Sequence, residues 1–193
     1  MYQEIEIEFK NMLTKEEFEH VLAFFKINKE SFALQENHYF DTRSFELKDK
    51  ESALRIRSKN GQYVLTLKQP AQEGLLETNQ PLTAEIALSL LEGAPIPDGY
   101  IKELIIQMDL LPERLEYFGM LATNRAELRY QGGLLVMDHS TYLGKEDFEL
   151  EYEADSVQKG KAIFEDLLKS LEIPQRKTEN KVRRFYQQKY SGN

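Results

Sequence analysis

Charged side chains of one sign recur at every second position in several short segments of this sequence. Glutamates stand at positions 4, 6 and 8 and again at 149, 151 and 153, whereas Arg55, Arg57 and Lys59 form a cationic row. Alternate residues of a β-strand point to the same face, so each row would share one face of its strand, opposite apolar residues. Because like charges at this spacing repel each other, the rows indicate a bound species of opposite charge.

Two kinds of ligand match these rows. Carboxylates are the preferred protein ligands of hard divalent cations such as Mg²⁺ or Mn²⁺. Arg and Lys bind phosphate oxygens, Arg through paired hydrogen bonds. An acidic row beside a basic row could therefore hold a polyanion bridged by divalent cations. The alternative is an ordinary antiparallel sheet with one solvated face, which accounts for each strand alone but poorly for the sorting of charges by sign.

Composition excludes other chemistries. The 193 residues contain no cysteine, which excludes disulfides, thiol nucleophiles, thiolate zinc sites and iron–sulfur clusters. The three histidines are too few and too scattered to indicate a histidine-rich metal site. A net charge of −8 disfavours nucleic acid and anionic membranes as partners. No signal peptide is recognisable at the start, and no segment has the ~20 apolar residues of a membrane span. We therefore expect a cytoplasmic protein without a membrane or nucleic-acid partner, either a monomer or a homodimer.

Hydrophobic periodicity predicts strands alternating with a few helices. Helices are expected over 15–26, where Thr14 and Glu17 form a capping box, in parts of 82–118, where Thr83 is the expected N-cap, over 156–171, and near the end of the segment after Pro174. The pair Asn60-Gly61 predicts a hairpin turn within 53–69. Period-two alternation predicts strands over 2–10, 35–41, 53–59, 62–69, 74–80, 121–131, 134–143 and 147–154.

These elements predict an α+β fold. The helices carry enough apolar surface to cover one face of a sheet, which leaves the charged face to look inward. A barrel of about eight strands encloses room for one small ligand. We therefore expect a closed eight-stranded antiparallel β-barrel, a tunnel with helices packed on its outside, formed as a single domain by residues 1–193.

Several segments resemble one known family. The run Glu6-Ile7-Glu8-Phe9-Lys10 resembles the E-x-E-x-K signature of the CYTH superfamily, the triphosphate tunnel metalloenzymes. Further matches follow in the family's order across nearly the whole chain: Tyr39-Phe40-Asp41-Thr42, Leu54-Arg55-Ile56-Arg57, Leu65-Thr66-Leu67-Lys68, Arg125, Asp138, the acidic strand 149–153 and Lys181.

The resemblance implies a divalent-metal site, for Mg²⁺ or Mn²⁺, beside a phosphate site. The implied metal ligands are Glu6, Glu8 and Asp138 with two of Glu149, Glu151 and Glu153, where either Glu149/Glu151 or Glu151/Glu153 fits the family pair. The residues implied to bind the triphosphate are Arg55, Arg57, Lys68, Arg125 and Lys181. The residues implied as catalytic are Glu6, Glu8, Lys10 and Asp138.

The resulting hypothesis is metal-dependent hydrolysis of a linear triphosphate, with inorganic tripolyphosphate slightly ahead of thiamine triphosphate or a nucleoside triphosphate. Two alternatives use the same residues: an adenylyl cyclase that makes cyclic AMP from ATP, and a non-catalytic module that binds polyphosphate or triphosphates. Arg183 is expected to be solvated or at a tunnel lip. His38 and His139 are expected to be exposed or structurally bonded.

Overall fold

The structure, a computed structural model, describes residues 1–190, and its internal contacts divide the chain into two compact units. The first unit consists of Met1–Ile5 and Gln35–Leu121, and the second of Glu6–Leu34 and the chain from Ala122 onward. The elements in chain order are β1 (Tyr2–Glu6), β2 (Glu8–Leu13), α1 (Lys15–Phe25), a 3₁₀ turn (Lys29–Ser31), β3 (Ala33–Asp41), α2 (Glu46–Asp49), β4 (Ala53–Lys59), β5 (Gln62–Pro70), β6 (Leu75–Leu82), α3 (Ala84–Leu91), α4 (Tyr100–Gln107), a second 3₁₀ turn (Pro112–Arg114), β7 (Glu116–Tyr130), β8 (Gly133–Tyr142), β9 (Lys145–Glu153), α5 (Val157–Ser170) and α6 (Lys181–Tyr190).

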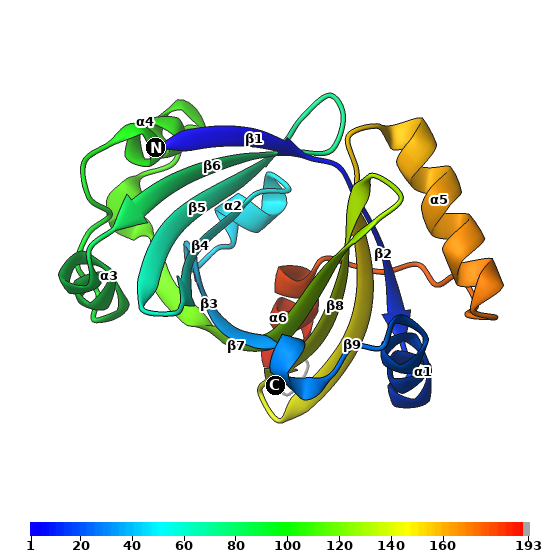
Figure 1. The fold of residues 1–193 in the computed structure, drawn as a ribbon. Helices are drawn as coiled ribbons and strands as arrows, with labels where there is room; N and C mark the ends of the chain where they lie inside the picture. Colours follow the sequence, from blue (N-terminus) through cyan, green and yellow to red (C-terminus); the bar gives the residue numbers. More distant parts are fainter. Residues whose placement is uncertain (191–193) are drawn as a thin grey trace. The chain divides into compact units, whose positions relative to one another are not determined.

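The first unit is an antiparallel sheet backed by two short helices. Its strands follow the order β1-β6-β5-β4-β3 (Figure 1). The turn between β4 and β5 places Asn60 and Gly61 at φ angles of 52° and 74°, as a tight two-residue hairpin requires. The core of this unit joins apolar residues of the strands to α3 and α4, including Leu54, Ile56, Leu65, Leu67, Ala87, Leu90, Ile101 and Ile105. The alternate residues of β4 and β5 therefore lie on the opposite, polar face.

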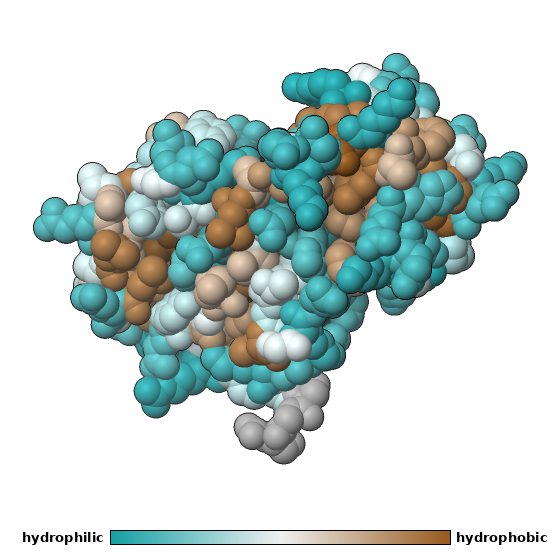
Figure 2. All heavy atoms as spheres, turned by 60° about the horizontal axis from the view of Figure 1, so that its bottom comes forward, coloured by the Kyte–Doolittle hydropathy of each residue, from teal (hydrophilic) through white to brown (hydrophobic). Residues whose placement is uncertain are grey.

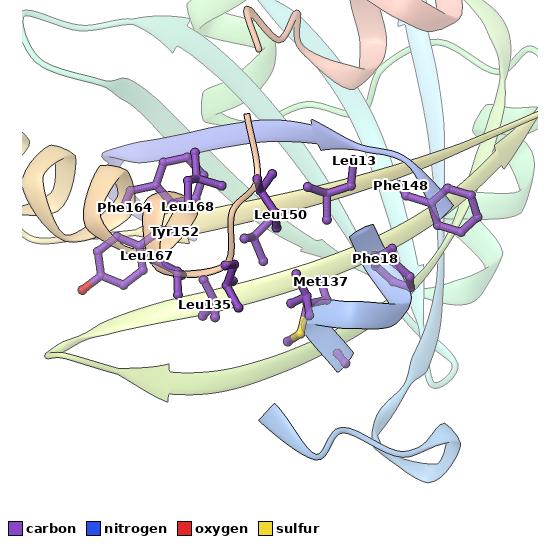
Figure 3. Packing of buried hydrophobic residues seen from close by; sticks show 14 residues of the cluster. Leu13, Phe18, Leu135, Met137, Phe148, Leu150, Tyr152, Phe164, Leu167 and Leu168 are labelled. Atoms are coloured by element: carbon purple, nitrogen blue, oxygen red, sulfur yellow. The ribbon is translucent and has the colours of Figure 1, made fainter. Parts of the chain in front are cut away.

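The second unit repeats this arrangement with different helices. Its strands follow the order β7-β8-β9-β2, and α1 and α5 contact β2 and β9. Figure 3 shows the buried cluster in which Phe18 of α1 and Phe164 and Leu167 of α5 meet the apolar side chains of the strands, such as Leu135 and Leu150. The helices thus cover the apolar face of this sheet, while the charged residues of β8 and β9 face the other way.

The capping box predicted for the first helix is present. The Thr14 hydroxyl accepts a hydrogen bond from the Glu17 backbone N–H at 3.2 Å, and the Glu17 carboxylate accepts one from the Thr14 N–H at 2.8 Å. Both contacts satisfy N–H groups that the first turn of a helix leaves without partners. The helix consequently begins at Lys15, as the sequence predicted.

Two predicted boundaries were wrong. The segment 2–10 was expected to be one strand, but β1 ends at Glu6 and β2 begins at Glu8, because β1 pairs with β6 whereas β2 pairs with β9. The described residues therefore contain nine strands rather than eight. Strand β7 begins at Glu116, inside the range expected to be helical. The prediction of antiparallel strands with helices on the sheet is confirmed, and the prediction of a single domain stays a prediction.

No helix among residues 1–190 is both long and apolar enough to cross a membrane. Large apolar side chains that are more than half exposed include Ile5, Phe24 and Ile106. On the face drawn in Figure 2, hydrophobic groups are separated by hydrophilic side chains.

Candidate functional site

A buried carboxylate cluster lies on the polar face of the sheet in the second unit. The strand register sets Arg125 of β7 opposite Asp138 of β8, and Asp138 opposite Glu149 of β9. Glu151 lies two residues further along β9 and shares this face. Asp138, Glu149 and Glu151 are 0%, 1% and 3% exposed, so their charges are almost completely removed from water. Burial of this kind requires partners of opposite charge.

Arg125 provides one of these partners. Its Nε and Nη2 atoms donate to the two carboxylate oxygens of Asp138 at 2.8 and 2.6 Å, and Nη2 also donates to Glu151 at 2.8 Å. This is the fork-like pairing of a guanidinium with a carboxylate, which is stronger than a hydrogen bond between neutral groups.

Lys181, the first residue of α6, provides the other partner. Its Nζ lies 2.8 Å from an oxygen of Asp138 and 2.8 Å from an oxygen of Glu149, and it also pairs with Glu151. Burial raises the pKa of Asp138 and of Glu151, but Lys181 and Arg125 outweigh it, so the pKa of each carboxyl lies below its usual value. Asp138 and Glu151 are therefore ionised at neutral pH.

The neighbouring stretch of β2 and β9 carries an excess of negative charge. The register sets Glu8 opposite Glu153 and Lys10 opposite Glu151. Burial, together with the charges of Glu6, Glu151 and Glu8 and in spite of Arg125, raises the pKa of Glu153 to about 7. Lys10 pairs with Glu8, and although burial lowers the pKa of Lys10, the charges of Glu8, Glu151 and Glu149 raise it above the usual value. The predicted E-x-E-x-K residues thus adjoin the carboxylates of β9.

The first unit carries a separate cationic cluster. The register sets Lys68 of β5 opposite Glu77 of β6, and the two side chains form an ion pair. Arg55 Nη2 lies 3.7 Å from the same Glu77 oxygen, and Arg57 donates to Asn37 at 3.0 Å. Arg55, Arg57 and Lys68 therefore share one polar face of this sheet.

Sequence reasoning missed Glu77. Burial raises the pKa of its carboxyl, but Arg55, Lys68 and Arg57 together lower it to about 2. The available signal was the alternation within 74–80, which places Glu77 on the same face as Asn79, whose side chain accepts a hydrogen bond from Thr66.

The carboxylates of the second unit suit a hard divalent cation. Every candidate ligand is an oxygen donor, the type that Mg²⁺ and Mn²⁺ prefer. Glu149 Oε1 is buried with no hydrogen-bond partner, whereas Oε2 accepts from Arg184 at 2.7 Å and pairs with Lys181. A buried oxygen without a partner costs about 1–3 kcal/mol, and a cation would remove that cost. Within residues 1–190, no three such side chains are yet close enough together to hold a metal. The oxygen donors of these residues suit a divalent cation, but the side chains must come closer to one another to bind it.

Other predicted positions have structural roles. Asp41, within the Tyr39–Thr42 match, accepts hydrogen bonds from the backbone N–H groups of Thr42 and Leu47 at 2.8 and 2.9 Å and of Lys48 at 3.2 Å, which fixes the start of α2. Arg183 has a side chain that is 61% exposed.

The side chains of His38 and His139 each contact a polar side chain. The ring of His38 lies 3.2 Å from the hydroxyl of Tyr117, and that of His139 lies 2.9 Å from Glu146. Both side chains are bonded, as expected, and the expectation that neither is catalytic stays a prediction.

Buried carboxylates and cations on the polar faces of antiparallel strands agree with the family that the motifs resemble. Residues 4–186 match the CYTH domain, and the chain belongs to the CYTH family, whose triphosphate tunnel metalloenzymes use divalent metals. A Bacillus subtilis (strain 168) protein named "Putative triphosphatase YjbK" is 52% identical over 189 residues, which cover 98% of each chain.

Solved structures share the fold. A crystal structure described as a putative adenylate cyclase from Bacillus halodurans is 44% identical, with a TM-score of 0.93 over 96% of this chain and 100% of that one. Another solved structure, from Hippeastrum, described as a putative adenylyl cyclase with a dominant triphosphatase activity, is 24% identical, with a TM-score of 0.74 over 94% of this chain and 95% of that one. The α+β fold class of antiparallel tunnel type that the sequence predicted is thereby confirmed.

Proposed function

We propose that this protein is a divalent-metal-dependent hydrolase of linear triphosphates, with inorganic tripolyphosphate as the first candidate substrate and thiamine or nucleoside triphosphates as the next. The observation that carries the proposal is the buried set of Asp138, Glu149 and Glu151 paired with Arg125 and Lys181. The name of the Bacillus subtilis relative supports the same reaction class.

The acidic residues would hold the metal. Glu6, Glu8 and Asp138 would do so with Glu149 and Glu151, since these two are almost fully buried, whereas the Glu153 side chain is 32% exposed. A bound divalent cation supplies positive charge at phosphate oxygens and activates water for attack. Lys10 would keep Glu8 in place through their ion pair.

The basic residues would bind phosphate oxygens. These are Arg55, Arg57 and Lys68 in the first unit and Arg125 and Lys181 in the second. Guanidinium and ammonium groups held in a site of low water content stabilise the charge that spreads over a phosphoryl group during transfer. Arg125 Nη1 makes a long contact of 4.0 Å with Glu153, which makes it the end of the guanidinium best able to turn toward a phosphate.

The proposal is tested by product analysis on the purified full chain. Tripolyphosphate, thiamine triphosphate and ATP would each be supplied with Mg²⁺ or Mn²⁺, and both phosphate and cyclic AMP measured. We expect phosphate release that a chelator abolishes. No phosphate from any of the three substrates would overturn the proposal.

Two variants test whether the buried carboxylate cluster takes part in the reaction. Asp138→Asn keeps the shape of the side chain but removes its charge, and we expect it to lower kcat/KM at least about 100-fold. Glu146→Gln, a change at a 55% exposed carboxylate on the same strand pair, serves as the matched control. Equal activity in Asp138→Asn and the control would show that the cluster does not act in the reaction.

A second candidate function is cyclisation of ATP, favoured by the description of the Bacillus halodurans structure. It uses the same metal and phosphate contacts. Cyclic AMP formed together with pyrophosphate, rather than free phosphate, would identify it. Metal-dependent triphosphate binding without turnover would instead identify a non-catalytic binding module.

A further inference from the structure

Glu149 is held by one oxygen only. Its Oε2 accepts from Arg184 Nη2 at 2.7 Å and lies 2.8 Å from Lys181 Nζ, while Oε1 is buried without a hydrogen-bond partner. A carboxylate restrained through one oxygen presents the other in a fixed direction. The Oε1 atom of Glu149 is therefore held in a fixed direction, as an oxygen that binds a cation would be.

Arg184 is itself fixed by a second carboxylate. Its Nε donates to Asp147 Oδ2 at 3.0 Å, and its Nη1 donates to the backbone carbonyl of Glu179. Each edge of the guanidinium thus has its own acceptor, so the planar group cannot rotate without breaking a charge-assisted contact. The Arg184 side chain is only 12% exposed, which limits screening of these contacts by water.

Asp147 has a further partner that orients it. The Tyr142 hydroxyl donates to the same Asp147 oxygen at 2.5 Å. Burial and the charge of Asp147 raise the pKa of Tyr142 to about 12, so this hydroxyl remains a donor at neutral pH. The Tyr142 ring also contacts the buried ring of Phe185, the residue after Arg184, at a centroid distance of 5.9 Å. This apolar contact ties α6 to the β8–β9 turn region.

We propose that Arg184 is a positioning residue for the divalent-metal site: by holding Glu149 through Oε2, with Asp147 and Tyr142 as supports, it leaves Oε1 to bind the cation. The inference rests on the proposed function, because it takes Glu149 to be a metal ligand. Lys181 and Arg184 lie three residues apart on α6 and so project from the same side of the helix. Lys181 contacts three carboxylates, whereas Arg184 restrains Glu149 alone among them.

Metal affinity, measured without substrate, tests this role. Titration of the full chain with Mn²⁺, followed by calorimetry and by the electron paramagnetic resonance signal of free Mn²⁺, would be compared between the unchanged protein and Arg184→Gln. Loss of a residue that orients a metal ligand weakens metal affinity by about 10–100-fold, and we expect that range here. Arg183→Gln, on the exposed side of the same helix, is the matched control and should bind Mn²⁺ unchanged.

Two further variants separate orientation from charge and from folding. Arg184→Lys keeps the charge but cannot reach both acceptors with a planar fork, so we expect it to recover only part of the affinity. Asp147→Asn weakens the support while retaining Arg184, and we expect a smaller loss in the same direction. Saturating Mn²⁺ should restore most of kcat in Arg184→Lys, because orientation of a ligand governs occupancy of the site.

The outcomes distinguish this inference from the proposed function. If the unchanged protein binds Mn²⁺ and hydrolyses a triphosphate while Arg184→Gln binds Mn²⁺ equally well or more tightly, the positioning role is wrong and the function stands. Tighter binding would mean that Arg184 only repels the metal. If the unchanged protein binds no Mn²⁺, the metal-dependent function fails, and the inference fails with it.

Discussion

Replacing Glu77 by Gln removes the carboxylate that neutralises Lys68 and Arg55 in the first unit while keeping almost the same side-chain shape. The side chains of Glu77, Lys68 and Arg55 are 9%, 17% and 11% exposed, so water screens their interaction poorly. The substitution leaves two half-buried cations facing a neutral amide. It therefore tests the charge of Glu77 rather than its packing.

The size of the effect follows from the pKa of Glu77. This pKa lies at about 2 instead of the usual 4.5, since Arg55, Lys68 and Arg57 outweigh the effect of burial. One pKa unit corresponds to about 1.4 kcal/mol, so the ionised carboxylate contributes about 3 kcal/mol to the free energy of unfolding at neutral pH. Because the folded-state pKa is below the unfolded-state value, this stabilisation is complete above the unfolded-state pKa. It is lost as the pH falls toward 2.

Urea unfolding at neutral pH and near pH ~3 measures both parts of this expectation. Glu77→Gln should be less stable than the unchanged protein by about 3 kcal/mol at neutral pH and by about half as much near pH ~3. Glu73→Gln, at an exposed glutamate in the loop before β6, should change neither value. Equal stability of Glu77→Gln and the unchanged protein at neutral pH would refute the reasoning. A loss that stays constant on acidification would also refute it.

Three other substitutions test separate features. Asp41→Ala should lower the free energy of unfolding by about 2 kcal/mol because three backbone N–H groups lose their acceptor. Asp41→Asn should lose less stability. Equal losses of stability in urea titrations of the two variants would contradict the capping role. Gly160→Ala should cost about 1–3 kcal/mol, because its Cβ would lie 2.6 Å from both Ala154 Cβ and Phe9 Cε2; an unchanged or higher Tm would count against this contact. Lys181→Ala leaves three buried carboxylates without their ammonium partner and should cost about 3 kcal/mol or more, and Mn²⁺ should raise the Tm of this variant more than that of the unchanged protein. Equal shifts in Tm would argue against a cation site there.

Features set by neighbouring residues were predictable from the sequence. The capping box at Thr14, the N-cap at Thr83 and the turn at Asn60-Gly61 each depend on a few adjacent positions, and all three are present. Period-two alternation also placed Arg55 and Arg57 on one face of their strand, and Glu149, Glu151 and Glu153 on one face of theirs. Strand geometry alone fixes these faces, whatever the partner strand.

Features set by distant partners were not predictable in this way. The break at Ile7 reflects a change of partner strand, and nothing in the alternation of 2–10 marks it. The acceptors of Arg184 lie 37 and 35 residues away, at Asp147 and Glu149. Its spacing of three residues from Lys181 was the one available signal. The proposal of Glu149 rather than Glu153 as a metal ligand likewise rests on burial, which the even spacing of the three glutamates does not reveal.

The division of the chain has a consequence for how the protein is synthesised. Apart from the five residues Met1–Ile5, the first unit is one continuous stretch, Gln35–Leu121, so its hairpins and helices can assemble while the ribosome is still making the rest. The second unit needs β2 and α1 from the beginning and β8, β9 and α5 from the end. Phe9, Phe18 and Val21 therefore lack most of their native neighbours until β8, β9 and α5 have been translated. The segment 9–21 is therefore the part of the nascent chain that a chaperone would protect most.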